Sequence, residues 1–194
     1  KNIPGASKDP RFWASGISVV MHMQNPHIPA MHFNTRYICT TQNWFGGGMD
    51  VTPSIKDGNE KNKFHRSLKT MCDRHNKNYY KKYKKWCDEY FYLHHRNEAR
   101  GIGGIFFDYK KDNFEKDFKF VRDVGVTFQL IFNKIITKKI KKKWASKEKE
   151  NQYIKRGRYA EFNLLYDRGT KFGLQTGGNV EGILMSLPPT AKWK

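Results

Sequence analysis

Two segments near the start of the chain, residues 15–23 and 31–39, alternate in side-chain character, and only a short loop with two prolines separates them. A repeat of two residues is typical of a β-strand, and strands joined by a short connection pair in an antiparallel fashion. Such a pair would gather its polar positions on one face of a sheet. These positions are Ser18, His22, His32, Asn34 and Arg36.

The rest of the chain mixes helical and extended patterns. Apolar residues recur with helical spacing in residues 59–76, 78–95 and 114–135, and Asp112 with Glu115 predicts a capping box for the last of these helices. Three consecutive glycines at 46–48 are expected to disfavour regular structure. Further strands are expected at 105–108, 158–166 and 181–187, with turns at 167–170 and 176–179. Clustered strands with helices between and around them predict a mixed, largely antiparallel α+β layer fold.

The charge of the chain predicts an anionic partner. Lys and Arg number 37 against 18 Asp and Glu, which gives a formal net charge of +19. A positive charge of this size would attract nucleic acid, anionic lipid, or a polycarboxylate or phosphate ligand. The lysines concentrate in residues 134–149, which is either a solvated helix face or an electrostatic footprint for RNA or DNA. No helix-turn-helix, zinc-finger, RRM or KH pattern accompanies them.

Other classes of protein fit the sequence poorly. An aromatic share of 15% argues against disorder, and no apolar run approaches the roughly 18–20 residues that span a bilayer. The 3 cysteines cannot form a disulfide framework, and their odd number fits a reducing compartment.

No classical catalytic motif stands out among the chemistry-bearing residues. The histidines lack HExxH spacing, the cysteines lack CxxC spacing, and no serine lies in a nucleophile elbow. Among the carboxylates, Asp50, Glu161 and Asp167 are expected to be structural. Asp108 is the best functional candidate, because it ends a short strand behind a glycine-rich loop.

Several sequence strings, in order along the chain, carry a more specific signal. The chain resembles the oxygen-dependent coproporphyrinogen III oxidases in these strings. They are Ser18–His22, His32–Tyr37, Trp44–Gly48 with Asp50, Phe64–Arg66, Tyr83–Asp88, His95–Glu98, Arg100–Asp108, Arg156–Tyr159, Glu161–Thr170, Phe172–Gly178 and Ile183–Pro189. The resemblance implies one coproporphyrinogen oxidase-like domain over residues 1–194, a large, mostly antiparallel sheet flanked by helices on both faces, and a homodimer. It also implies that family segments at both ends are absent here, and Asn179 and Gly182 stand where the family commonly has Arg and Ser.

The resemblance implies an enzyme of haem and porphyrin biosynthesis. It would convert coproporphyrinogen III to protoporphyrinogen IX by oxidative decarboxylation of two propionates to vinyl groups, with O2 as co-substrate and CO2 and H2O2 as by-products. The family uses no organic cofactor, and its bacterial members are described with a divalent metal cation. A bacterial member would be cytoplasmic, without a membrane span and without nucleic acid as a partner.

The resemblance also assigns roles to particular residues. His32 would be the catalytic proton donor, and Asp108 would hold pyrrole N–H groups or accept a proton. The expected substrate-binding residues are Ser18, Asn34, Thr35, Arg36, Arg100, Arg168, Gly177, Gly178 and Asn179. The expected metal ligands are His22, His32, His65 and His95. Two other hypotheses are a homologue that binds tetrapyrrole without turning it over and a basic nucleic-acid-binding module.

Overall fold

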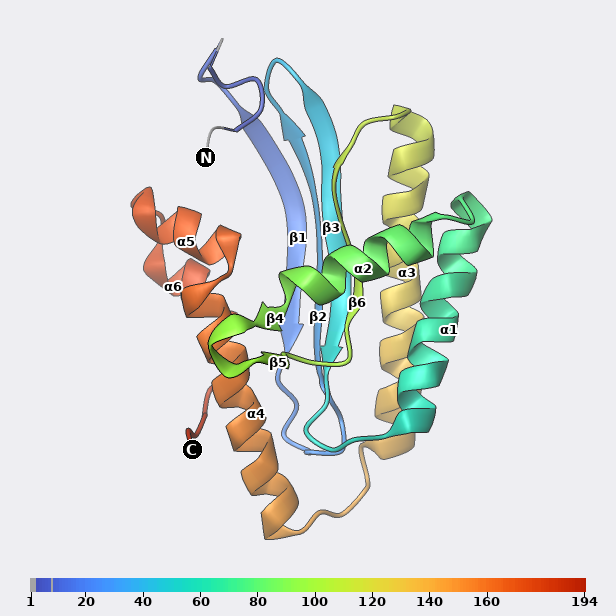
Figure 1. Ribbon diagram of the computed structural model, residues 1–194, viewed down its shortest axis with the longest axis vertical. Helices are drawn as coiled ribbons and strands as arrows, with labels where there is room; N and C mark the ends of the chain where they lie inside the picture. Colours follow the sequence, from blue (N-terminus) through green and yellow to red (C-terminus); the bar gives the residue numbers. More distant parts are fainter. Residues whose placement is uncertain (1–2, 8) are drawn as a thin grey trace.

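A four-stranded antiparallel sheet forms the centre of the computed structural model, which describes residues 3–7 and 9–194 (Figure 1). The strand order is β1-β2-β3-β6, and the strands are β1 (Trp13–Met21), β2 (Ala30–Cys39), β3 (Asn43–Thr52) and β6 (Gly104–Lys110). Ser18 lies opposite Asn34, and Arg36 lies opposite both Gly16 and Gly46. The predicted antiparallel pair and its shared polar face are therefore confirmed.

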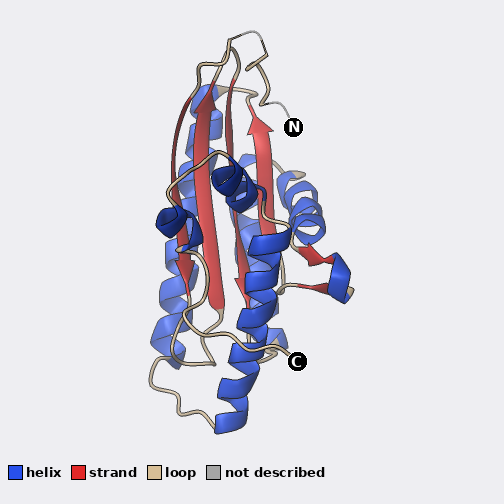
Figure 2. Ribbon diagram, turned by 90° about the vertical axis from the view of Figure 1, so that its left-hand side faces the viewer, coloured by secondary structure: helices blue, strands red, loops and turns tan. Residues whose placement is uncertain are grey.

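In the described part of the chain, six helices surround the sheet, and a small hairpin follows the second of them. In Figure 2 the four long strands stand side by side as one layer, with the helices packed around them. The helices are α1 (Gly58–His75), α2 (Tyr79–Tyr90), α3 (Phe114–Lys139), α4 (Ser146–Leu165), α5 (Arg168–Gln175) and α6 (Val180–Leu184). The hairpin joins β4 (Tyr92–Leu93) to β5 (Glu98–Ala99) through a 3₁₀ turn, His94–Arg96.

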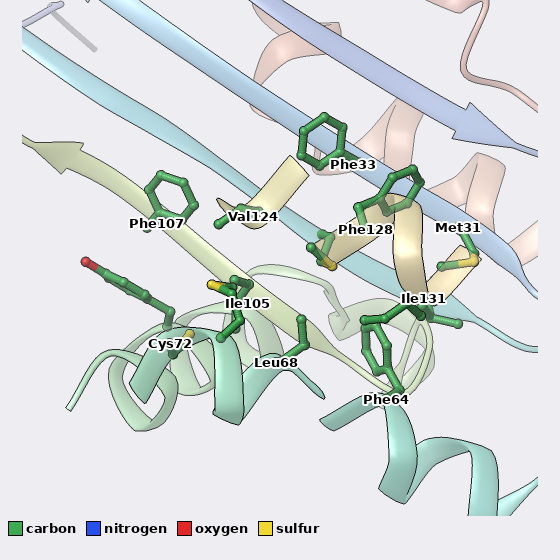
Figure 3. Packing of buried hydrophobic residues seen from close by; sticks show 14 of the residues in the cluster. Met31, Phe33, Phe64, Leu68, Cys72, Ile105, Phe107, Val124, Phe128 and Ile131 are labelled. Carbon is green, nitrogen blue, oxygen red and sulfur yellow. The ribbon is translucent and has the colours of Figure 1, made fainter. Parts of the chain in front are cut away.

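The larger core lies between the apolar face of the sheet and helices α1 and α3 (Figure 3). Met31 and Phe33 alternate with the polar residues of β2, so they point away from the polar face and into this core. The rings of Phe33 and Phe128 stack with centroids 5.1 Å apart, which fastens α3 to the sheet. Burial of this apolar surface is the main force that holds the layers together.

A second cluster covers part of the opposite face. Phe106 projects from β6 on the polar side of the sheet and stacks on Tyr90 of α2 at 4.5 Å. Phe162 of α4 and Leu93 complete this cluster, and both are fully buried. Helices therefore pack on both faces of an antiparallel sheet, and the predicted α+β class is confirmed.

Two expected strands are helices in the structure. Residues 158–166 belong to α4 and its C-terminal cap, and residues 181–187 fall on α6 and the turn that follows. The buried positions of α4 recur every three or four residues, but several of them are polar, such as Gln152 and Arg156. A hydrophobic pattern cannot reveal a helix whose buried stripe is partly polar. The expected turn at 167–170 is the N-terminal start of α5, with Asp167 as its cap, whereas the turn at 176–179 is present.

Three smaller expectations also need correction. The glycines at 46–48 lie within β3 and do not interrupt it. Their missing side chains allow the neighbouring strands to approach closely, because a Cβ on Gly48 would lie 2.3 Å from the Ile105 carbonyl oxygen. Helix α3 is capped by Asn113, not Asp112. Helix α2 ends at Tyr90, and the remainder of the expected helix forms the β4–β5 hairpin.

Across the described residues no helix has the length and hydropathy required to cross a bilayer.

Candidate functional site

A cleft of about 630 Å³ opens on the polar face of the sheet. This volume lies within the range of about 300–1,000 Å³ that is common for small-molecule sites. Its floor comes from β1, β2 and β6, and its walls come from the end of α2, the start of α5 and the N-terminal segment. The predicted site residues that line it are Ser18, His32, Asn34, Thr35, Arg36, Asp108 and Arg168.

Arg36 and Asp108 form an ion pair at the floor of the cleft. The Arg36 Nη2 atom donates to Asp108 Oδ2 at 2.7 Å, and the Arg36 side chain keeps 30% of its surface exposed. Asp108 also accepts from its neighbour's backbone, the Tyr109 N–H, at 3.0 Å. The pair is therefore ordered but accessible, and it presents both a cation for a carboxylate and an acceptor for an N–H group.

Gly46 makes room for this ion pair. A Cβ at Gly46 would lie 2.6 Å from Asp108 Oδ1 and 2.8 Å from Arg36 Cζ. Gly46 stands directly opposite Arg36 in the register, so its missing side chain leaves the space that the guanidinium occupies. At this position the glycine serves a close side-chain approach, at the register shift between β3 and β6, and its φ is not positive.

His32 is held by partners at both ring nitrogens. Nδ1 lies 2.8 Å from Asp50 Oδ1, and Nε2 lies 3.0 Å from Asn34 Nδ2. Asn34 Oδ1 accepts from Arg36 at 3.2 Å, which orients the amide so that its N–H group points to the imidazole. With these partners, Nδ1 donates to Asp50 and Nε2 accepts from the Asn34 amide.

Arg100 lies behind His32, on the far side of Asp50. Its Nη2 atom donates to Asp50 Oδ2 at 2.6 Å, and both side chains are almost fully buried. Burial alone would raise the pKa of Asp50, but the positive Arg100 and the bond from His32 outweigh it and lower the pKa. The guanidinium also faces the rings of Phe91, Tyr159 and Phe162 at 4.0–4.6 Å. Arg100 therefore supports Asp50 and does not stand on the floor of the main cleft.

A smaller hollow of about 230 Å³ adjoins the cleft and shares Ser18 and His32 with it. Asn163 and Ser186 contribute to its lining and hydrogen-bond to each other at 2.9 Å. Tyr90 and Asp167 stand between α2 and α5, where the phenol donates to the carboxylate at 3.0 Å. This contact fixes the start of α5, which carries Arg168, against the body of the protein.

The loop after α5 stands apart from these residues. Gly177, Gly178 and Asn179 are exposed and do not line either hollow, and the Asn179 side chain caps α6 by accepting from the Gly182 N–H at 3.2 Å. An expected substrate contact at Asn179 is therefore a helix cap in this structure. Gly182 and Ile183 of α6 do line the smaller hollow.

The four expected metal ligands do not converge. His22 Nε2 bonds the Ser186 carbonyl oxygen at 3.0 Å, and His65 Nε2 bonds that of Ile102 at 2.8 Å. His95 lies between Tyr166 and Glu161, on the β4–β5 hairpin side of α4. No group of three or more His, Cys, Asp or Glu side chains that could hold a metal occurs among residues 3–7 and 9–194. The donor set therefore does not fit a resident metal, and the expectation of a four-histidine site is corrected.

Sequence reasoning undervalued two kinds of residue. Asp50 was expected to be structural, yet it is the partner of His32 at the edge of the cleft. Its position two residues beyond Gly48 on β3, on the same face as Gly46, is the signal that could have found it. The rings of Tyr90, Phe91 and Phe106 form an apolar wall of the cleft, a role for which the sequence offered no signal.

Comparisons with known proteins agree on one family. A family model described as coproporphyrinogen III oxidase matches residues 2–194. Proteins named oxygen-dependent coproporphyrinogen-III oxidase from Rickettsia bellii (strain OSU 85-389), Rickettsia rickettsii (strain Sheila Smith) and Rickettsia akari (strain Hartford) are each 58% identical over 192 residues. The matched segment covers 98% of this chain and 69% of each relative. This chain belongs to the coproporphyrinogen III oxidase family.

Proposed function

We propose that this chain catalyses the oxygen-dependent oxidative decarboxylation of coproporphyrinogen III to protoporphyrinogen IX. For each propionate the reaction consumes one O2 and one proton, and it yields a vinyl group, CO2 and H2O2. The observation that carries the proposal is the meeting of His32, Arg36 and Asp108 in one cleft, in a chain 58% identical to named oxidases.

The cleft matches the chemistry of a large, flat polycarboxylate. Arg36 and Arg168 supply cations that can bind propionates, and the rings of Phe91 and Phe106 supply an apolar surface for the macrocycle. The net charge of +19 favours the approach of an anionic substrate. The enzyme then has to orient a reduced macrocycle that itself supplies the electrons to dioxygen.

Proton movements would fall to His32 and Asp108. Asp108 can accept a hydrogen bond from pyrrole N–H groups or take the proton that leaves the propionate side chain. His32 can deliver a proton from Nε2 once the ring is protonated and the Asn34 amide has turned its N–H group away from Nε2; Asp50 then stabilises the imidazolium through Nδ1. Arg100 keeps Asp50 ionised, so the charge on the far side of the ring is constant.

A turnover assay tests the proposal. The purified chain is mixed with coproporphyrinogen III under air, and protoporphyrin fluorescence is followed after autoxidation of the product. We expect product under air, none under argon, and a strong loss in His32→Ala, while His75→Gln, which lies between α1 and α3 and outside the cleft, retains the activity. Assays with and without a chelator are expected to agree, because the donor set does not fit a metal.

Binding of coproporphyrin without decarboxylation would contradict the proposal. It would identify the chain as a tetrapyrrole-binding homologue, with Asn179 in place of the family's common Arg as the first position to revert. Restored turnover in Asn179→Arg would then locate the defect in that loop.

We also propose that the chain acts as a homodimer. Support comes from β1, which forms one edge of the sheet. Trp13 and Ile17 of β1, and Phe12 directly before it, each expose more than half of their surface. Apolar side chains at a sheet edge are typical of an association surface. Light scattering coupled to gel filtration should give about twice the mass of 22.9 kDa, and a monomer at micromolar concentration would argue against the dimer.

We also propose a cytoplasmic location, which the resemblance implies for a bacterial member of the family. Cys39, Cys72 and Cys87 are all free thiols, as a reducing compartment would keep them. Cell fractionation tests this location directly.

A further inference from the structure

The connection between α3 and α4 carries the strongest charge feature outside the cleft. We call residues 140–145 the lysine loop. From residue 134 to residue 147 the chain contains no acidic residue. Six lysines in this stretch are exposed, and none takes part in a salt bridge within the described chain. They are Lys134, Lys138, Lys141, Lys142, Lys143 and Lys147.

Two large apolar side chains stand among these lysines. Ile140 is 53% exposed and Trp144 is 41% exposed. A solvated charged surface does not require an exposed indole, whereas a tryptophan surrounded by lysines is typical of a protein segment that rests in the interface of a bilayer. The two exposed side chains lie at the two ends of the Lys141–Lys143 run.

The lysine loop is held in a fixed shape by two buried side chains. Asn25 Nδ2 donates to the carbonyl oxygens of Lys139 and Lys142 at 3.1 and 2.8 Å, and His27 Nε2 lies 3.1 Å from that of Lys143. Asn25 and His27 are 5% and 8% exposed. Because the backbone carbonyls turn inward to these partners, the lysine side chains and Trp144 are displayed outward on an ordered base.

We propose that the lysine loop is a docking surface for an anionic lipid bilayer. The lysines would neutralise lipid headgroups while Ile140 and Trp144 enter the apolar boundary. Figure 1 places this loop at the lower end of the molecule, whereas α5, which borders the cleft, lies on the left above the middle. Docking through this loop therefore does not cover α5 or the Arg168 that it carries at the cleft.

RNA is the competing anionic surface, and the observations favour lipid. Recognition of single-stranded nucleic acid uses arginines and several stacked aromatic rings along a groove. The lysine loop has no arginine and only one aromatic ring, and Lys149 lies 5.9 Å over that ring. It also lines none of the four best-formed hollows among the described residues.

Vesicle co-sedimentation of the whole chain tests the proposal, independently of turnover. We expect binding to vesicles of phosphatidylcholine with phosphatidylserine, weak binding to phosphatidylcholine alone, and release by added salt. At about 1 kcal/mol for each lysine near an anionic surface, Lys141→Gln/Lys142→Gln/Lys143→Gln should weaken partitioning roughly 100-fold. The matched control is Lys81→Gln/Lys82→Gln/Lys116→Gln, which removes the same charge elsewhere on the surface. These three lysines are exposed and form no salt bridge within the described chain. The control should change partitioning far less than the loop triple.

Insertion of Trp144 gives a second readout. The difference between the fluorescence spectra of the wild-type chain and Trp144→Phe should shift to the blue when anionic vesicles are added. Equal losses in the two lysine triples, or an unshifted difference spectrum, would overturn the proposal. Tighter binding to poly(U) than to anionic vesicles, lost in the same loop triple, would overturn it in favour of RNA. Circular dichroism of both triples verifies that they are folded.

Discussion

Asn34 shows how one amide can organise a site of this kind. Its oxygen accepts from Arg36 and its nitrogen donates to His32, so the amide links the cation at the floor of the cleft to the imidazole. Through Asp50 the chain of contacts continues to the buried Arg100. Each of these side chains is held in place by hydrogen bonds to a neighbouring side chain. The site is therefore organised before substrate arrives, which lowers the free-energy cost of reaching the transition state.

Replacing Asp108 with Asn tests the role of its charge. Asp108→Asn keeps the shape but removes the carboxylate, so we expect kcat to fall by about 10²–10⁴-fold, as is usual when a general base is lost. The ion pair with Arg36 is partly exposed, so the free energy of unfolding should fall by no more than about 1 kcal/mol. Product fluorescence and urea denaturation measure the two effects. Asp73→Asn, which breaks the surface pair with Lys69 on α1, is the control and should retain full activity.

The space at Gly46 gives a separate prediction. In Gly46→Ala the new methyl group would collide with the ends of the Arg36 and Asp108 side chains, which can move, and not with backbone. We therefore expect kcat/KM to fall at least about tenfold, the equivalent of about 1.4 kcal/mol, while the protein stays folded. Gly58→Ala meets no atom within 4 Å and should leave kcat/KM unchanged. Equal activity of the two variants would show that the ion pair does not need the space.

Elements with a clear apolar period were predictable from the sequence, and elements without one were not. Strands β1 and β2 alternate over most of their length, and α3 repeats apolar residues at every turn, so their type and face could be predicted. Helix α4 buries Gln152, Arg156 and Asn163 among its apolar residues, which hides its period. Within the site, the alternation on β1 and β2 predicted a shared polar face, but the burial of Arg100 depends on distant aromatic rings that no local pattern contains.

The N-terminal cap of α3 can be tested directly. Asn113 accepts from the Lys116 N–H at 3.0 Å, so Asn113→Ala should lower the free energy of unfolding by about 1 kcal/mol and the Tm by roughly 2–4 °C. Asp112 is exposed, and the buried Lys110 that it contacts at 3.2 Å also pairs with the buried Asp117 at 2.6 Å, so Asp112→Ala should cost less. Thermal unfolding of the two variants compares them. A larger loss in Asp112→Ala would restore the cap expected from the sequence.

The charge of the whole molecule makes its carboxylates important for stability. They number 18 with the aspartates and glutamates counted together, and several of them neutralise clusters of cations. Glu161 is the clearest example: it binds Arg96 at 2.6 and 2.9 Å, His95 at 2.7 Å and Arg158 at 3.2 Å. These contacts join α4 to the β4–β5 hairpin. Protonating such groups leaves the Lys, Arg and His side chains uncompensated, so acid should unfold the protein cooperatively.

Glu161 supplies a pH test of this idea. The hydrogen bonds from Arg96, opposed by burial and aided by His95 and Arg158, lower the pKa of Glu161 from 4.5 to about 2. Because its folded pKa lies below its unfolded value, its contribution to stability is complete above about pH 4.5 and is lost as the pH falls toward 2. The slope of unfolding free energy against pH in this window should therefore be smaller in Glu161→Gln than in the wild type. Glu150→Gln removes an exposed carboxylate that pairs with Lys192 and should keep the wild-type slope. Urea denaturation at a series of pH values measures the slopes, and identical slopes for all three proteins would show that the acid sensitivity arises elsewhere.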